Sequence, residues 1–141
     1  MELTKGKKAE MDWKELLEGL RKLTKKGPEN IDAWNNLGNA YANLTRHDDA
    51  IAAFREVIRL DPEDADAWVG LGLTYGSLTR HDDAIEAFRQ ATRLDPEYAD
   101  AWYNLGILYA VSADQSAALN AACELRRLDP ERADKLFELV T

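Results

Sequence analysis

The chain has 141 residues, of which 45% are hydrophobic and 31% are charged, which is typical of a soluble protein with one compact domain. Its formal net charge of −8 argues against a nucleic-acid partner, because phosphate backbones repel an acidic protein. No stretch reaches the roughly 18 consecutive apolar residues of a membrane span and no export signal is visible, so we expect a cytoplasmic protein with no membrane span.

The N-terminal part divides into a polar segment and an apolar one. Residues 1–10 are polar and contain lysines, and we expect them to form a flexible leader. Residues 11–27 carry an apolar stripe with helical spacing, at Trp13, Leu16, Leu20 and Leu23. The same spacing returns further along the chain, at His47, Ala50, Phe54 and Val57. Residues 11–27 are therefore predicted to be an N-terminal capping helix over the segment that follows.

A pattern that recurs at a constant interval runs from residue 28 to residue 129, in three copies of equal length at 28–61, 62–95 and 96–129. Its markers are Pro28, Pro62 and Pro96, then Trp34, Trp68 and Trp102, then Leu37-Gly38, Leu71-Gly72 and Leu105-Gly106, then Tyr41, Tyr75 and Tyr109. This pattern resembles the tetratricopeptide repeat, in which W-x-x-L-G-x-x-Y marks the first of two helices. The resemblance implies a stack of helix-turn-helix units.

Each copy contains two apolar stripes with the spacing of a helix. In the first copy they are Trp34, Leu37, Tyr41 and Leu44, and then Ala50, Ile51, Phe54, Val57 and Ile58. Gly38 and Ala50 are small where two antiparallel helices must approach each other closely. We therefore expect an all-α fold, a right-handed superhelical solenoid of three helix-turn-helix repeats with N- and C-terminal capping helices.

The third copy departs from the other two. Ala122 stands where the first two copies have a phenylalanine, so we expect looser packing there unless Phe137 compensates. Leu136 and Leu139 fall at the positions of the repeat's tryptophan and leucine. Residues 130–141 are therefore predicted to form a C-terminal capping helix.

The resemblance also implies that the first helix of each unit exposes one face to a concave groove that binds a peptide. The residues predicted on this face are Asp32, Asn35, Asn36, Asn39, Asn43, Asp66, Val69, Leu73, Ser77, Asp100, Tyr103, Asn104, Ile107 and Val111. The face is rich in amides in the first copy, mixed in the second and apolar in the third, with an aspartate along one border. Amides can bond to a peptide backbone, and the aspartates attract Lys or Arg. We expect a non-catalytic adaptor that binds an extended peptide segment with basic and apolar residues.

Residues that could support catalysis or metal binding are few. His47 and His81 lie beside aspartates in equivalent turns, but such turns are about 10 Å apart in packed helices, too far to share one zinc ion. Cys123 has no base near it in the sequence. No phosphate-binding loop, dinucleotide-binding motif or zinc-protease motif occurs. We therefore expect no enzyme activity, no cofactor and no metal.

Three other interpretations stay open at this point. The chain could be a self-assembling structural scaffold, a homo-oligomer formed through the third repeat. It could be an engineered or excised array of repeats, because the first two copies are nearly identical around their turns. The polar face could also be a solvated surface that binds nothing.

Overall fold

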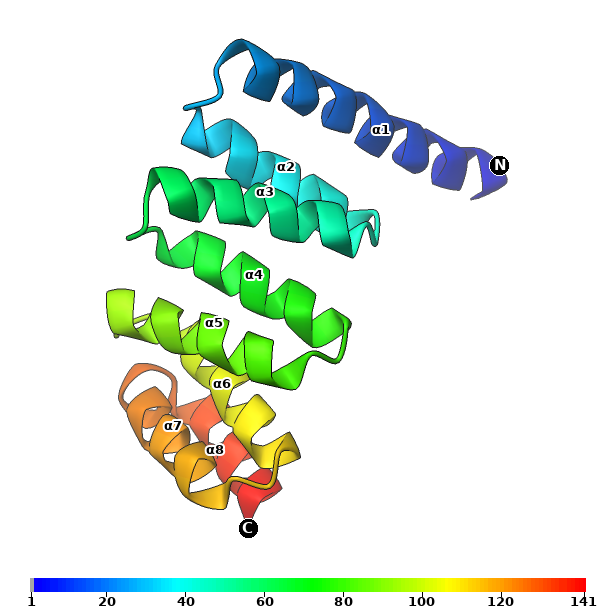
Figure 1. Cartoon of the computed structure of the whole chain (residues 1–141). Coiled ribbons are helices and arrows are strands. Elements are labelled where there is room, and N and C mark those ends of the chain that lie inside the picture. Colours follow the sequence, from blue (N-terminus) through cyan, green and yellow to red (C-terminus); the bar gives the residue numbers. More distant parts are fainter. Residues whose placement is uncertain (1) are drawn as a thin grey trace. The chain divides into compact units, whose positions relative to one another are not determined.

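The computed structural model describes the backbone of residues 2–141 and the side chains of residues 12–141. Every regular element in this part of the chain is an α-helix, which confirms the predicted all-α class (Figure 1). The helices are α1 (Glu2–Lys26), α2 (Ile31–Asn43), α3 (His47–Leu60), α4 (Ala65–Ser77), α5 (His81–Leu94), α6 (Ala99–Val111), α7 (Gln115–Leu128) and α8 (Pro130–Val140). The leader predicted at residues 1–10 lies outside the residues described in full and stays a prediction.

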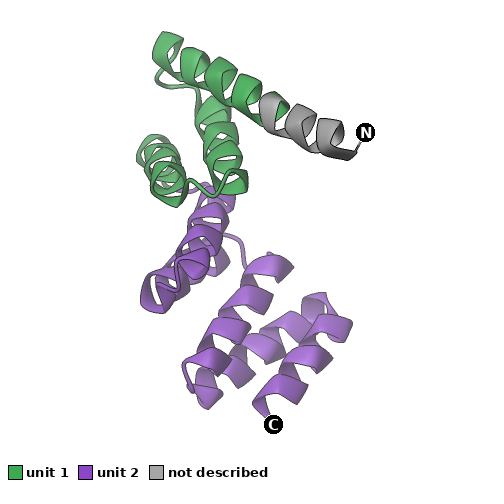
Figure 2. Cartoon of the chain, turned by 90° about the vertical axis from the view of Figure 1, so that its right-hand side faces the viewer, with its two compact units in different colours: residues 1–62 green, residues 63–141 purple. Residues whose placement is uncertain are grey.

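The helices form two compact units, residues 1–62 and residues 63–141 (Figure 2). Unit 1 contains α1 and the hairpin of α2 and α3. Unit 2 contains the hairpin of α4 and α5, the hairpin of α6 and α7, and then α8. The two helices of each hairpin pack along each other.

The three hairpins share a tight turn with the same backbone geometry. Its central residue is left-handed, with φ of 57° at Thr45, 55° at Thr79 and 61° at Ala113. This region is costly for residues other than glycine. The turn is closed by a backbone hydrogen bond, which Arg80 N donates to Tyr75 O at 2.9 Å in the second hairpin.

In each of the first two hairpins a glycine of the first helix lies directly against a phenylalanine of the second. A Cβ added to Gly38 would lie 2.8 Å from the ring of Phe54, and one added to Gly72 would lie 2.8 Å from the ring of Phe88. Both rings are almost fully buried. A small residue is therefore needed at Gly38 because the side-chain ring of Phe54 packs directly on it, whereas the sequence argument gave the close approach of the two helix backbones as the reason.

The recurring proline and tryptophan are linked by a hydrogen bond. Trp34 Nε1 donates to the carbonyl oxygen of Pro28, and Trp102 Nε1 donates to that of Pro96, both at 2.8 Å. Proline lacks an N–H but keeps its carbonyl acceptor. The bond ties the loop before each of these first helices to the helix itself and gives a reason for the tryptophan, although any residue would supply the backbone acceptor that proline supplies here.

Helix α1 packs against α2 through a face that includes Leu20 of the predicted stripe but is rotated away from Leu16 and Leu23. Leu17, Leu20 and Thr24 are each 6% exposed, whereas Leu16 and Leu23 are 49% exposed. Thr24 can be buried because its hydroxyl donates to the carbonyl oxygen of Arg21 at 2.9 Å, which satisfies its polar atom. A sequence pattern that counts only apolar residues selects Leu23 instead.

Helix α8 packs against α6 and α7 and completes the core of unit 2. Leu136 is fully buried, and a Cβ added to Gly106 would overlap its Cδ2. In the other hairpins a phenylalanine of the second helix fills this place, which Ala122 leaves empty. The expectation that Phe137 compensates is wrong, because Leu136 does so and the half-buried Phe137 ring faces the Arg126 guanidinium at 4.7 Å.

Candidate binding surface

In unit 1, α2 exposes a row of amide side chains. Asn36, Asn39 and Asn43 are exposed and Asp32 lies one turn before them, while Asn35 is half-buried. Asn43 Nδ2 donates to the backbone oxygen of Asn39 at 2.9 Å. At about 1.5 Å per residue the row from Asn36 to Asn43 is about 10 Å long, which matches about three residues of extended peptide.

In unit 2, α4 exposes less of the predicted face. Leu73 is 51% exposed, and the exposed Ser77 donates its hydroxyl to the carbonyl oxygen of Leu73 at 3.1 Å. Val69 is 7% exposed and lies in a core cluster with Phe88 of α5 and Leu105 of α6. The prediction that Val69 lies on the open face is therefore corrected, because its side of α4 packs against the next hairpin.

Two aspartates of the predicted acidic border have partners inside unit 2. The Tyr98 hydroxyl donates to Asp66 Oδ1 at 2.6 Å, and Arg132 Nη1 lies 2.7 Å from Asp100 Oδ1. Partial burial and the hydrogen bond to Asp66 raise the pKa of Tyr98, so its hydroxyl stays protonated near neutral pH. Asp100 is thus compensated by a cation, whereas the partner of Asp66 is neutral. Asp32 of unit 1 makes no ion pair or hydrogen bond through its side chain with another described residue.

The apolar zone predicted on α6 is partly covered by α8. Tyr103 and Ile107 are half-buried and pack against the cluster that contains Leu136. The Arg132 guanidinium lies 5.2 Å from the centroid of the Tyr103 ring. Val111 is 62% exposed. The prediction of an open pocket at Tyr103, Ile107 and Val111 is therefore corrected, since the chain's own helix packs on the first two of these residues.

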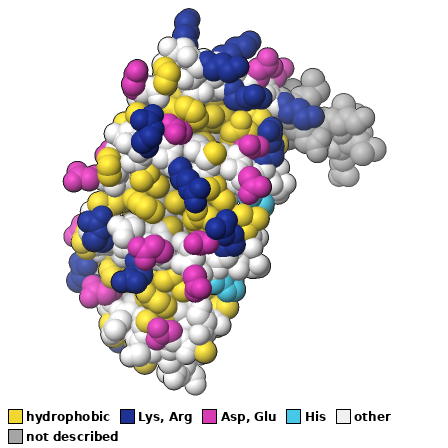
Figure 3. All heavy atoms as spheres, in the orientation of Figure 1, with side chains coloured by type: hydrophobic (Ala, Val, Ile, Leu, Met, Phe, Trp, Pro, Cys, Tyr) yellow, Lys and Arg dark blue, Asp and Glu magenta, His cyan; other side chains and the backbone are white. Residues whose placement is uncertain are grey.

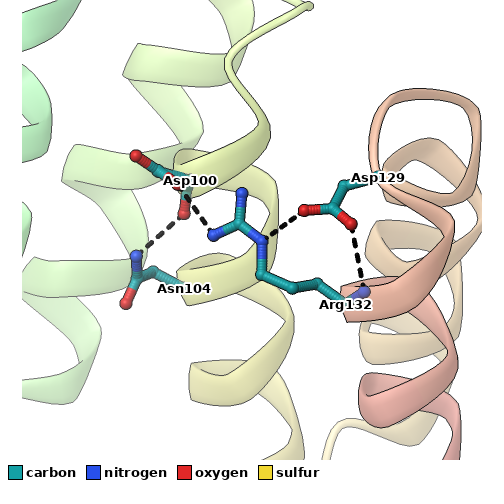
Figure 4. Close-up of polar contacts among 4 residues, drawn as sticks. All are labelled: Asp100, Asn104, Asp129 and Arg132. Carbon is teal, nitrogen blue, oxygen red and sulfur yellow. Dashed lines mark hydrogen bonds and ion pairs between the residues drawn. The ribbon is translucent and has the colours of Figure 1, made fainter.

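Arg132 connects the start of α6 to the start of α8 (Figure 4). Its Nε donates to Asp129 Oδ2 at 2.7 Å, while Asp129 Oδ1 accepts from the Arg132 backbone N–H at 3.2 Å and caps α8. Asn104 Nδ2 donates to the backbone oxygen of Asp100 at 2.8 Å. The hydrogen bonds from Arg132 hold the pKa of Asp129 below its ordinary value, and those to Asp129 and Asp100 raise the pKa of Arg132. The network fixes α8 on α6.

The described residues offer no cluster of metal ligands. Among residues 12–141 no group of three His, Cys, Asp or Glu side chains is placed to hold an ion. Cys123 is exposed, and His47 and His81 begin α3 and α5. No helix in the described part of the chain combines the length and the apolar character needed to cross a membrane.

Comparison with protein-family models finds two matches. The model described as "Tetratricopeptide repeat" matches residues 31–64, which include α2 and α3. The model described as "TPR repeat" matches residues 80–110, which include α5 and most of α6. The chain is a tetratricopeptide repeat protein. Tetratricopeptide repeats are protein-protein interaction modules, and this chain is one in that general sense.

Solved structures show the same fold. A structure of MamA is 24% identical, with a TM-score of 0.81 over 99% of this chain and 93% of that chain. TTC0263, a thermophilic tetratricopeptide repeat protein of Thermus thermophilus, is 20% identical, with a TM-score of 0.74 over 88% of this chain and 71% of that chain. The Arabidopsis OM64 tetratricopeptide repeat domain is 17% identical, with a TM-score of 0.73 over 79% of this chain and 94% of that chain. The comparison with curated proteins finds no match.

Sequence reasoning missed Tyr98 and Arg132. In the tetratricopeptide register they are one repeat apart, and so are their acceptors Asp66 and Asp100. In both pairs a donor near the start of one helix reaches back 32 residues to the first turn of an earlier helix. The equivalence of these positions in the repeat register could have indicated the two pairs. The repeat pattern itself, however, does not specify which residue stands there.

Proposed function

We propose that the chain is an adaptor that holds an extended, basic segment of a partner protein along the open face of α2. The observation that carries this proposal is the row of exposed amides at Asn36, Asn39 and Asn43. Each amide has two N–H donors and a carbonyl acceptor, so a row of them suits the alternating donors and acceptors of a peptide backbone. The length of the row corresponds to about three residues of extended chain.

The charge near this row favours a cationic ligand. Asp32 lies one turn before the amides and is exposed. The chain has a net charge of −8, which attracts positively charged segments over distances of about a Debye length. Helix α8 packs on Tyr103 and Ile107, which were expected to select apolar side chains of the ligand. The preference therefore depends on basic rather than apolar residues of the ligand.

The test is the binding of labelled eight-residue peptides, measured by fluorescence anisotropy. One peptide carries Lys and Arg at alternate positions, and a second carries Glu at the same positions. The double variant Asn36→Ala and Asn39→Ala is expected to weaken binding of the basic peptide by about tenfold or more, as loss of central interface contacts does. Equal affinity of the variant and the parent protein would refute the proposal.

Asn104→Ala is the matched control. Asn104 occupies the same position in the third repeat as Asn36 does in the first. Its amide nitrogen already donates to Asp100 O, and this part of α6 lies beside α8. The control variant should bind the basic peptide as the parent protein does. Equal losses in the control and the double variant would mean that the weaker binding does not come from direct contacts with the α2 amides.

Self-association is a second candidate, favoured by the apolar C-terminal part of unit 2. Val111 and Leu139 are 62% and 63% exposed, and a cavity of about 230 Å³ is lined by Ala110, Ala113 and Leu139. Exposed apolar residues that cluster around a cavity are typical of an interface. Sedimentation velocity over a wide concentration range tests it: a concentration-dependent oligomer that Leu139→Lys abolishes supports this role, and a monomer throughout removes it.

A further inference from the structure

A cavity of about 300 Å³ opens on unit 2 where α5, α6 and α7 meet. Its apolar lining comes mainly from α6, through Trp102, Leu105 and Tyr109, with Ala121 of α7 beside them. Leu105 and Ala121 are buried, whereas Trp102 and Tyr109 keep part of their rings accessible. The volume is at the lower end of the range for ligand pockets, which suits one large side chain.

Two of the α7 residues that line the cavity differ from their equivalents in α5. Ala117 stands at the repeat position of Asp83, and Asn120 stands at that of Glu86. Both lie in the cavity wall. The shorter side chain at Ala117 leaves space, and both changes remove a carboxylate. Ser116 stands at the repeat position of Asp82, so the first turn of α7 carries no acidic residue, whereas the first turn of α5 carries Asp82 and Asp83.

The rim of the cavity is cationic. Arg89 and Arg93 of α5 line it, and no Asp or Glu is among the lining residues. Arg89 lies a loose 3.8 Å from Glu86, and Arg93 uses only its Nε, which donates to Gln90 at 3.0 Å. A guanidinium has five N–H donors, so both arginines retain donors for a carboxylate. On the face drawn in Figure 3, apolar atoms are exposed between charged side chains over α5 and α7.

We propose that this cavity binds a partner segment in which an aromatic or large aliphatic side chain is flanked by Asp or Glu. The apolar side chain enters between Trp102 and Tyr109, where rings stack favourably. The neighbouring carboxylate pairs with Arg93 and Arg89 at the rim. This site is separate from the amide row of α2 and selects the opposite charge, so it gives the adaptor a second docking point.

The probe is a nine-residue peptide with a central Phe and Asp or Glu at the flanking positions. It is titrated into the ¹⁵N-labelled full chain, and the indole N–H signal of Trp102 is followed by NMR. Two comparison peptides replace the central Phe by Ala or the acidic flanks by Lys. The acidic Phe peptide is expected to shift the Trp102 signal with saturation, and either replacement should weaken binding by about tenfold or more.

Two variants separate the parts of the site. Arg93→Glu reverses the charge of the rim, and Ala117→Leu fills the cavity; each should raise the dissociation constant of the acidic Phe peptide by about tenfold or more. The matched control is Arg59→Glu, at the equivalent position of the first repeat, where Arg59 pairs with Glu56. The control should change the dissociation constant by less than about twofold. Circular dichroism verifies that each variant is folded.

Four results would overturn the proposal: no saturable shift of Trp102, equal binding of the Ala-centred peptide, equal losses in Arg59→Glu and Arg93→Glu, or a dimer in sedimentation experiments that Ala117→Leu abolishes. The basic peptide that tests the α2 face is measured with the same variants, so that the two proposed sites are tested separately. Its binding should be unaffected by Arg93→Glu and Ala117→Leu. Failure of the acidic peptide alone therefore rejects the second site without rejecting the first.

Discussion

Replacing Gly106 by alanine tests how α8 closes unit 2. In a helix interior, alanine is favoured over glycine by about 1 kcal/mol, so the change alone should be stabilising. At Gly106, however, the new Cβ would overlap Leu136 Cδ2 and lie 3.1 Å from its Cδ1. Leu136 is fully buried and has little room to move, and such overpacking costs about 1 to 3 kcal/mol. The net effect is expected to range from neutral to a loss of about 2 kcal/mol.

Gly76→Ala is the control, because a Cβ at Gly76 in α4 would meet nothing within 4 Å. It should stabilise the protein by about 0.5 to 1 kcal/mol in urea unfolding followed by circular dichroism. The background variant Leu136→Ala removes the obstacle at a cost of about 2 to 5 kcal/mol. In that background Gly106→Ala should become stabilising, which gives a coupling energy of about 1 to 3 kcal/mol. A Gly106→Ala variant that is as stable as Gly76→Ala would show that Leu136 does not fill the place of the missing phenylalanine.

Three further predictions concern a turn and two titrating groups. Thr79→Asn should raise the free energy of unfolding by up to about 1 kcal/mol, because Asn tolerates a φ of 55° better than a β-branched residue does; lower stability in urea would contradict this. The lowered pKa of Asp129 means that its stabilising effect is present above about pH 4 and is lost as pH falls through its folded value. Asp129→Asn should therefore flatten the acid limb of the stability curve, and an unchanged limb would exclude Asp129 as its cause. The raised pKa of Tyr98 means that its contribution to stability is present below about pH 10 and is lost as pH rises further. In urea unfolding, the free energy of unfolding of Tyr98→Phe should therefore fall less steeply at alkaline pH than that of the parent protein does.

The helical hairpins could be predicted from the sequence because their determinants are local and recur in every repeat. Gly38 is small because Phe54 packs directly on it, and the apolar spacing places both residues on facing sides of one hairpin. Contacts inside a hairpin are fixed by helix periodicity alone.

Contacts between successive hairpins could not be predicted in the same way. Val69 lies on a face that is open within its own hairpin, and it is buried because α6 packs beside it. Likewise α8 could be predicted as a helix, but periodicity does not give the position at which it rests on α6. Ala122 indicated a vacant place, and the prediction that Phe137 fills it was wrong because the neighbouring Leu136 does so.

The core of the third hairpin is completed by a side chain of the following helix, α8, and this limits how further repeats can be added to the array. The first two hairpins each supply their own phenylalanine beside the glycine, so they are interchangeable building blocks. The third is complete only while Leu136 is present. Inserting another standard unit after residue 129 would displace that leucine, and the new junction would need Ala122→Phe at the same time. Duplication of the first or second unit requires no such paired change.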